Sequence, residues 1–339
     1  MIVADVSEED QQRMGMSVSG KSDLDQQRLM TKVAWLYHNR HMRQRDIAER
    51  LGVSQSRVSR LLDQAVDAGV VKITVIAPEG LHSALEESLE RRYGLREVHV
   101  FDIVGVAENE LDVVEALGHL VAARLQSQPL DARVIGLTSW SRSLRATVAA
   151  LEPMRADVDY VVEMLGDVGP VTLQHNAADA TRQLASLTGA QPLFLRIPGV
   201  IPNAVVRESL LSYDPDARRA LELHDRLDLA LVGIGTCEIV PPLIAGENFF
   251  TAEQFRHAAE QGAVGQVNLR FIAEDGTPVP TELDELVVGV TLQQLEKAER
   301  VLAVAGGPSK YLAIRAALLG GWVNALVTDL ATAEYLDSH

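Results

Sequence analysis

The spacing of apolar residues near the start of the chain predicts three short helices. Residues 24–39 carry apolar side chains three or four positions apart, which is the period of one helix face. The same period continues through residues 44–51, stops at Gly52, and resumes after Ser54. Glycine ends helices because it adopts positive φ at little cost, and serine begins them because its hydroxyl accepts a backbone N–H. The pattern therefore predicts two helices joined by a tight glycine turn, with a supporting helix before them.

The second helix of this pair has an apolar stripe and an outer face that is polar and basic. Val58, Leu61 and Ala65 form the stripe. Such an outer face is typical of a helix-turn-helix that binds duplex DNA, whereas in a plain helical hairpin the arginines would only be solvated charges. We expect Arg60 to read a base through a bidentate contact to guanine. The expected DNA contacts are Arg43, Gln44, Arg45, Ser54, Gln55, Ser56, Arg57, Ser59 and Arg60.

From about residue 81 onward, short apolar runs alternate with helical stretches. Near-continuous apolar strands between helices are typical of a parallel sheet that is buried on both faces. This part of the chain is therefore expected to be α/β, with a doubly wound and mostly parallel sheet. The expected strands are 97–103, 133–138, 158–165, 228–233, 300–305 and 322–328, and the expected helices include 108–126, 142–151, 175–187, 251–261 and 308–319.

Two further segments have the alternating pattern of half-exposed strands. Residues 70–76 alternate directly after the helix-turn-helix, where they would form either a wing or a strand that leads out of the domain. Residues 262–290 contain short alternating runs around the turn Glu274-Asp275-Gly276. Runs of this kind around a glycine turn predict a β-hairpin insertion.

Charge distinguishes the two parts of the chain. Residues 21–77 hold ten Lys/Arg and six Asp/Glu, although the whole chain has a net charge of −16. One basic segment in an acidic chain confines the binding of a polyanion to that segment. The expected organisation is a disordered lead (1–20), a helix-turn-helix domain (21–77), and an α/β domain for effector binding and oligomerisation (78–339).

Composition narrows the class of protein further. No run of eighteen apolar residues is present, and the acidic N-terminus lacks the basic residues of a signal peptide. The single cysteine, Cys237, excludes an intramolecular disulfide, and a reduced cytoplasmic location is expected. The nine histidines lack metal-ligand spacing, so no metal and no cofactor is expected.

Polar and glycine residues follow several of the expected strands. Residues 139–143 (SWSRS) follow one strand and residues 306–310 (GGPSK) follow another, each at the start of a helix. A glycine turn before a helix presents backbone N–H groups to an anion, and Lys310 adds a full charge. Because the carboxyl ends of parallel strands meet at one edge of a sheet, these segments predict a pocket for a sugar, polyol or sugar phosphate. His175 and Gln266 either line this pocket or serve as packing and solvent-exposed residues.

Six motifs follow one another along the chain. They are IAERLGVSQSRVSRLL (47–62), DLALVGIG (228–235), GAVGQ (262–266), VAGGPSK (304–310), AIRAAL (313–318) and NALVTDLATAEYL (324–336). In these motifs and their order the chain resembles the SorC family of sugar-responsive bacterial transcriptional regulators. The resemblance implies an effector domain similar to phosphosugar isomerases and deaminases but retained as a sensor. It also implies a homo-oligomer, either a dimer or a homotetramer built as a dimer of dimers.

The resemblance further implies which residues contact the effector. In such proteins the contacts come from the loop after an SWGRT-like strand, the following loop, the GAVG turn and the lysine of AGGxxK. Ser141 and Ser143 stand here where glycine and threonine are usual, and this SWS pattern resembles the polyol- and erythritol-responsive branch of the family. Carried over residue by residue, the contacts are Thr138, Ser139, Ser141, Arg142, Ser143, Gly166, Asn176, Gln266 and Lys310.

These features predict a DNA-binding transcriptional regulator of a carbohydrate or polyol catabolic operon, controlled by a sugar, polyol or sugar-phosphate effector. Two alternatives remain. A sugar-phosphate isomerase or deaminase fused to a DNA-binding head would need a carboxylate base at a strand end, where only Glu238 is near residues 233–236. An architectural DNA-binding protein would need no ligand at all.

Overall fold

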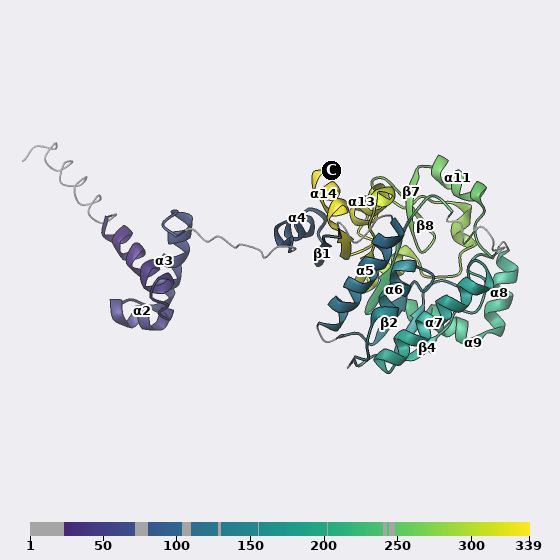
Figure 1. The fold of residues 1–339 in the computed structure, drawn as a ribbon, viewed down its shortest axis with the longest axis horizontal. Helices are drawn as coiled ribbons and strands as arrows, with labels where there is room; N and C mark the ends of the chain where they lie inside the picture. Colours follow the sequence, from purple (N-terminus) through teal and green to yellow (C-terminus); the bar gives the residue numbers. More distant parts are fainter. Residues whose placement is uncertain are drawn as a thin grey trace, which may run out of the picture. The chain divides into compact units, whose positions relative to one another are not determined.

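The chain divides into two compact units, residues 1–76 and 77–339, and each is described by itself (Figure 1). The expected disordered lead (1–20) and most of the expected wing strand (70–76) lie outside the described residues. The computed structural model describes residues 24–71, 81–103, 110–127, 130–154, 156–201, 203–239, 243 and 248–339.

The first unit is helical throughout its described part. A helix over residues 24–38 is followed by α2 (Gln44–Leu51) and α3 (Gln55–Asp67). Gly52 ends α2 with a φ of 65°, and the Ser54 side chain accepts a backbone N–H at the start of α3. The predicted helix-turn-helix is therefore confirmed. Its buried apolar core draws on all three helices and consists of Met30, Val33, Ala34, Leu36, Ile47, Ala48, Val58, Leu61, Leu62 and Ala65.

The second unit is built on a seven-stranded sheet in which every neighbouring pair is parallel. The strand order is β1-β10-β9-β5-β2-β3-β4. All six predicted strands are present, but the sequence pattern does not predict β4, which is a short edge strand with a central proline. The strands are β1 (Glu97–Phe101), β2 (Val134–Leu137), β3 (Tyr160–Glu163), β4 (Gln191–Leu193), β5 (Leu229–Val232), β9 (Arg300–Val304) and β10 (Ala325–Asp329).

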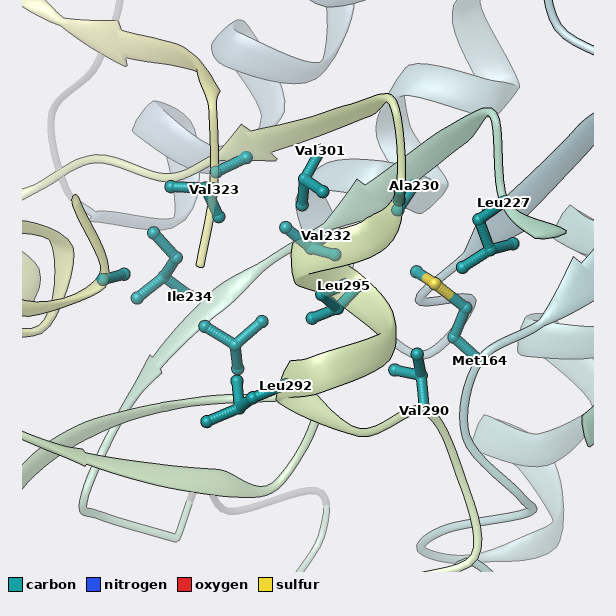
Figure 2. Close-up of a cluster of buried hydrophobic side chains, with 14 of the residues drawn as sticks. Met164, Leu227, Ala230, Val232, Ile234, Val290, Leu292, Leu295, Val301 and Val323 are labelled. Carbon is teal, nitrogen blue, oxygen red and sulfur yellow. The ribbon is translucent and has the colours of Figure 1, made fainter. Parts of the chain in front are cut away.

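Helices cover both faces of this sheet, as a doubly wound fold requires. Alternate residues along the strands enter two separate apolar cores, because successive side chains of a strand point to opposite faces. Figure 2 shows part of one core, in which Val232 and Val301 of the sheet lie near Leu295. The helices are α4 (Ser83–Tyr93), α5 (Glu110–Gln126), α6 (Arg142–Ala150), α7 (Val171–Thr188), α8 (Ala204–Tyr213), α9 (Pro215–Leu223), α11 (Ala252–Glu260), α12 (Leu292–Lys297), α13 (Tyr311–Leu319) and α14 (Leu330–Ser338).

A second, smaller sheet is antiparallel and follows directly from the end of β5. It consists of β6 (Ile234–Thr236), β7 (Ala263–Val267) and β8 (Arg270–Ala273), in that order. The hairpin insertion is present, but its β7–β8 turn lies at residues 268–269, both with positive φ, and not at 274–276. Residues 274–276 form a further turn, after which the chain pairs back along β8. The predicted GAVG turn is also displaced, because only its first glycine lies outside β7.

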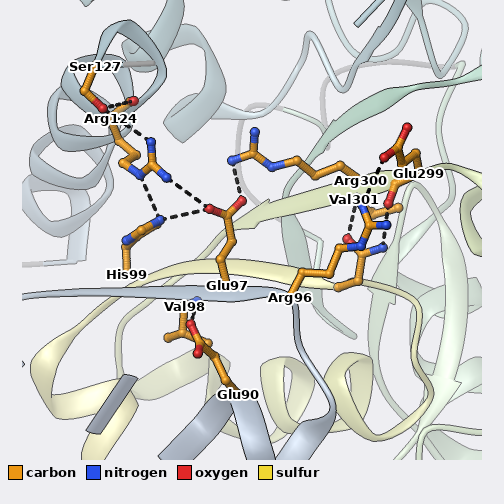
Figure 3. A network of polar contacts seen from close by, with 11 residues as sticks. Glu90, Arg96, Glu97, Val98, His99, Arg124, Ser127, Glu299, Arg300 and Val301 are labelled. Carbon is orange, nitrogen blue, oxygen red and sulfur yellow. Dashed lines mark hydrogen bonds and ion pairs between the residues drawn. The ribbon is translucent and has the colours of Figure 1, made fainter. Parts of the chain in front are cut away.

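The amino end of β1 carries a network of charged side chains (Figure 3). The Glu97 carboxylate lies 3.2 Å from His99 Nε2 and 3.3 Å from Arg124 Nη2, and its other oxygen pairs with Arg300. The hydrogen bond with His99 and the two guanidinium groups hold the pKa of Glu97 at about 2, despite partial burial. The network joins β1, α5 and β9 at the amino edge of the sheet, whereas the small sheet follows the carboxyl end of β5. Within the described ranges, no helix has the length and hydropathy to cross a membrane.

Candidate functional site

The recognition helix presents its polar residues where the sequence predicts them. Gln55, Ser56, Arg57 and Arg60 are exposed around the first turns of α3, opposite the buried stripe. Ser59 is half-buried at the margin of the two faces, so it is less accessible than expected. An exposed, basic first half of a recognition helix is suited to the major groove, where a duplex presents base edges between phosphates.

Contacts between near neighbours in the sequence orient the side chains on this face of α3. Ser54 Oγ accepts the N–H of Arg57 at 3.2 Å and lies 3.1 Å from Ser56 Oγ. Arg60 Nε donates to the carbonyl of Ser56 at 3.4 Å, a contact that does not use the two terminal guanidinium nitrogens. Each of these contacts spans four residues or fewer. The local sequence therefore determines the whole face.

The residues expected around the start of α2 lie together as well. Arg43 is exposed at the N-cap of α2, Gln44 is half-buried, and Arg45 is exposed with an ion pair to Asp46 at 3.5 Å. A helix N-terminus attracts phosphate, because its first N–H groups lack partners within the helix. Arg43 makes no side-chain cap there. This helix start is thus available to a phosphate of the DNA backbone.

The second unit holds a cavity at the carboxyl edge of its main sheet. Strand order reverses between β2 and β5: the chain runs from β2 towards β3 and β4 on one side, and from β5 towards β9 and β10 on the other. Ligands of open α/β sheets bind in the crevice at such a switch point. The cavity has a volume of about 170 Å³ and lies between the segments that follow β2, β5 and β9, with one wall added by the small sheet.

Six of the nine predicted effector residues line this cavity. Two come from the start of α6 and a third from its N-cap, one directly follows β2, one lies on β7, and one follows β9. They are Thr138, Ser141, Arg142, Ser143, Gln266 and Lys310. Arginine and lysine together make the cavity suited to polar ligands that include an anion, and the hydroxyls and the amide are suited to sugar hydroxyls.

The hydrogen-bond network determines which of these groups donate and which accept. Ser143 Oγ donates to the carbonyl of Val304 at 3.2 Å, so the 3.1 Å contact between Ser141 and Ser143 must use the Ser141 proton. The Ser141 oxygen therefore offers only lone pairs to a ligand, which suits a ligand hydroxyl. This polarity is a property of the pair of serines and follows from Ser143 being buried.

Gln266 has the opposite polarity. Its Oε1 accepts the N–H of Leu269 at 2.8 Å, which leaves the amide NH₂ as the group that reaches the cavity. A Cβ at Gly235 would lie 2.1 Å from this nitrogen, so any larger residue there would displace the amide. Behind it, Thr138 Oγ1 donates to Asn268 Oδ1 at 2.8 Å and ties β2 to the β7–β8 turn. Gln266 is thus a fixed donor to a ligand oxygen.

The glycine turn before Lys310 differs from the expected anion cradle. The N–H of Gly307 donates to Asp329 Oδ2 at 2.9 Å and to Thr332 Oγ1 at 3.0 Å, and Pro308 has no N–H. The Gly307 N–H is therefore occupied by the protein, and Lys310 carries a positive charge at this side of the cavity. Asp329 also accepts the N–H of Thr332 as the N-cap of α14, a role that an aspartate at a helix start can indicate from sequence. Its second role, as the acceptor of the Gly307 N–H, is not apparent from the sequence motif.

Three predicted effector residues lie outside the cavity. Ser139 is buried on the side of Glu163, and Gly166 packs against the backbone of residues 197–199, where a Cβ would lie 2.5 Å from the Ile197 oxygen. Asn176 is exposed on α7, because that helix begins at Val171 and not at residue 175 as expected. Their placement does not support a contact with the effector, and the same holds for His175, which is exposed on α7.

Residues missed by the sequence analysis complete the cavity. Trp140 lies within the quoted SWS motif, and Phe249 and Phe255 form apolar surface beside it. Arg145 is half-buried, its pKa is lowered by burial and by the adjacent Arg142, and its Nη1 donates to the carbonyl of Trp140 at 2.5 Å. Trp140 lies between two serines, and a tryptophan among polar residues can indicate a ligand-binding surface. Sequence spacing alone does not distinguish such a tryptophan from a core residue.

Acidic groups near the cavity are few. Glu238 is the one carboxylate among the described residues that line it, and it is exposed. Across the described part of the chain, no group of three or more His, Cys, Asp or Glu side chains could hold a metal ion.

Comparison with known proteins identifies the class. The family model described as "Putative sugar-binding domain" matches residues 80–336, and a MarR family model matches residues 33–77. The sorbitol operon regulator of Klebsiella pneumoniae is 30% identical over 92% of this chain and 98% of its own length. The erythritol catabolism regulatory protein EryD of Brucella abortus is 30% identical over 91% of this chain and 96% of its own length. The deoxyribonucleoside regulator of Bacillus subtilis is 29% identical over 93% and 98%.

The structural comparison agrees with the sequence comparison. The crystal structure of the full-length sorbitol operon regulator from Klebsiella pneumoniae matches with a TM-score of 0.66 and 28% identity, covering 91% of this chain and 98% of that chain. The fold and the site thus define a transcriptional regulator that joins a helix-turn-helix to a sugar-binding domain. The chain belongs to the SorC family of sugar-binding transcriptional regulators. Its near-equal identities to the three relatives do not favour the erythritol-responsive branch.

Proposed function

We propose that this protein is a cytoplasmic transcriptional regulator of a carbohydrate or polyol catabolic operon, whose operator binding is controlled by a sugar, polyol or sugar phosphate. The observation that carries the proposal is the cavity at the switch point of the sheet, where fixed donors, fixed acceptors and cationic side chains converge. Relatives that regulate sorbitol and erythritol genes support the same class of effector. The protein performs no chemistry on this ligand.

The six predicted residues that line the cavity are here named the polar wall, and each has a defined task in this proposal; they are Thr138, Ser141, Arg142, Ser143, Gln266 and Lys310. Ser141 accepts from an effector hydroxyl, Gln266 donates to an effector oxygen, and Lys310 with Arg142 attracts a phosphate or a partly negative oxygen. The start of α6 has no side-chain cap, so its first N–H groups add to the attraction. Thr138 and Ser143 position the others.

The DNA-binding residues divide by the kind of contact they make. Gln55, Ser56 and Arg60 read base edges in the major groove, and Arg60 does so through its terminal nitrogens. The remaining predicted residues bind phosphates and hold the helix in register; they are Arg43, Gln44, Arg45, Ser54, Arg57 and Ser59.

Control of DNA binding requires at least a dimer, because a two-fold operator presents two half-sites about one helical turn apart. In this account the protein is a homodimer or homotetramer whose effector domains hold the subunits together. The effector binds one quaternary arrangement more tightly than the other, and this difference shifts the spacing of the two recognition helices. A ligand without such a preference would leave operator affinity unchanged.

A thermal-shift screen of the full-length protein against sugars, polyols and their phosphates tests the proposal. A ligand at 100 times its Kd should stabilise the protein by about 2.7 kcal/mol. NMR spectra of the same mixtures should show the compound unchanged after prolonged incubation. Absence of stabilisation by every compound contradicts a sensor, and turnover of a sugar phosphate establishes an enzyme instead.

A further inference from the structure

The effector cavity has two unlike walls. One is the polar wall described above, and the other consists of Trp140, Phe249 and Phe255 and is here named the aromatic wall. A ligand with hydroxyls on every side would leave such a surface unused, because polar groups gain nothing from contact with an apolar ring. The aromatic wall therefore indicates that one side of the effector has an apolar surface.

The aromatic wall is a built surface. Phe249 stacks on Phe255 with ring centroids 5.8 Å apart, and Trp140 meets Phe249 near edge-on at 6.4 Å. Phe250 and Phe271 pack against the same rings, so this cluster holds four of the six phenylalanines in the chain. Phe249 and Phe255 are buried, which fixes their orientation beside the cavity.

Trp140 connects the aromatic wall to the polar wall. It directly precedes Ser141, and Arg145 holds its carbonyl oxygen. Its indole Nε1 is buried and has no hydrogen-bond partner among the described residues. Trp140 therefore places an aromatic ring directly beside the hydrogen-bonding groups of the polar wall.

The volume of the cavity is sufficient for about one ring. Its volume is about 170 Å³. An engineered apolar cavity of about 150 Å³ in another protein binds benzene, so a space of this size accepts a single six-membered ring.

Ring-closed sugars and open-chain polyols differ in the surface they offer to this wall. Ring closure gathers C–H groups on a face, and their partly positive hydrogens are attracted to the negative face of an aromatic ring. An open-chain polyol carries hydroxyls in all directions, so contact with the wall would strip them of water without a replacement partner. The polyol also loses internal rotations on binding that a ring has already lost.

We propose that the effector is a single ring-closed sugar, free or phosphorylated, whose C–H face packs on the aromatic wall while its hydroxyls meet the polar wall. The proposal rests on the proposed function and narrows its effector class. Open-chain polyols are then poor ligands for this protein.

Calorimetry on the full-length protein with matched pairs of probes tests the proposal. Each pair has one carbon skeleton: D-sorbitol against 1,5-anhydro-D-sorbitol, and ribitol against 1,4-anhydro-D-ribitol, both also as terminal phosphates. In at least one pair, the ring-closed member should bind tenfold or more tightly than its open-chain partner.

Trp140→Ala should weaken binding of the ring-closed member at least tenfold and leave binding of the open-chain member within threefold. Trp140→Phe, which keeps an aromatic face, should stay within about threefold for both.

Trp322→Phe is the matched control, because Trp322 donates to the Gly276 oxygen at 2.7 Å and does not line the cavity. Open-chain partners that bind as tightly as the rings in every pair, or rings indifferent to Trp140→Ala, overturn the proposal. If such an open-chain ligand still shifts operator affinity, the proposed function stands without this inference. If no probe of either kind binds or shifts operator affinity, both are contradicted.

Discussion

The two functional surfaces of this protein are built in opposite ways. In the DNA-binding unit, the polar residues are exposed, contact only near neighbours in sequence, and rest on a core without a buried polar side chain among residues 24–71. In the effector unit, the residues of the polar wall are buried or half-buried except for Arg142, and two of them are oriented by partners more than a hundred positions away: Thr138 by Asn268 and Ser143 by Val304. Side chains that contact a DNA groove can adjust their conformation on binding. A small ligand instead requires hydrogen-bonding groups whose orientation is fixed before it binds.

Among the described residues, buried titratable groups lie only in the effector unit, and the opposite pKa shifts of two of them give the largest expected effects. Burial raises the pKa of Glu163 to about 7, although Thr181 and the N–H of Leu195 donate to it. Burial lowers the pKa of His224 to about 4. Glu163 therefore contributes stability at low pH that is lost as pH rises from about 4.5 to 7. His224 contributes stability at neutral pH that is lost as pH falls from about 6.5 to 4.

The two contributions to the pH dependence of stability oppose each other. A variant that removes one titratable group should therefore show the pH dependence that the other group causes. Relative to the wild type, Glu163→Gln should gain about 3 kcal/mol between pH 4.5 and 7, and His224→Gln should show the opposite trend of similar size. Urea unfolding in a Trp35→Phe background measures this, since the remaining tryptophans lie in the effector unit. Parallel pH profiles for the two variants would contradict the assigned shifts.

Lys310→Ala tests whether the polar wall binds the effector. Loss of a charged hydrogen-bond donor should weaken effector binding about 30-fold, or about 2 kcal/mol, and leave operator affinity unchanged. Calorimetry with the tightest-binding compound of the screen measures this. Lys297→Ala is the matched control, because that exposed lysine on α12 has only a 3.9 Å ion pair with Asp225. An unaltered Kd in Lys310→Ala would remove this residue from the site.

Arg60→Ala tests the exposed face of the recognition helix. Loss of a bidentate base contact should reduce discrimination among operator variants about tenfold, or about 1.4 kcal/mol, without changing effector affinity. Fluorescence anisotropy with a series of single-base operator variants measures the discrimination. Arg28→Ala, an exposed arginine outside the helix-turn-helix pair, serves for comparison. If Arg60→Ala weakened every sequence equally, it would be a phosphate contact.

Ser54→Ala gives the smallest expected effect and reports on the local construction of the DNA-binding unit. Loss of the N-cap that accepts the Arg57 N–H should destabilise this unit by about 1 kcal/mol. Trp35 fluorescence during urea unfolding measures this, because Trp35 is the one tryptophan in that unit. Ser59→Ala should have less effect, since Ser59 lies within the helix. Equal losses in the two variants would show that the cap contributes nothing specific.

The contrast between local and long-range contacts also explains which parts of the fold and of the effector site the sequence predicts. The helix-turn-helix depends on contacts within four residues, so Gly52, Ser54 and the apolar stripe predict it correctly. The parallel strands are equally visible, because each is a buried apolar run. The effector site depends on convergence of distant segments, and its prediction was incomplete: Gly166 and Asn176 lie away from the cavity.

Two details of the site follow from tertiary structure and leave no mark on spacing. The Gly307 N–H is occupied by Asp329, which only the pairing of β9 with β10 brings near. The aromatic wall draws Phe249 and Phe255 from a segment whose spacing is that of an ordinary core. A pattern along the chain identifies such residues as apolar, but their position beside the cavity depends on the whole fold.

The most direct test of the account is the operator affinity of the full-length protein as a function of effector. A duplex selected from a random library by the protein itself serves as the operator, and anisotropy is followed while the tightest-binding sugar is titrated. The account predicts a saturable change in operator Kd of fivefold or more, centred at the calorimetric Kd of the sugar and displaced to about 30-fold higher concentration in Lys310→Ala. An operator Kd that stays constant while the sugar saturates the cavity would contradict it.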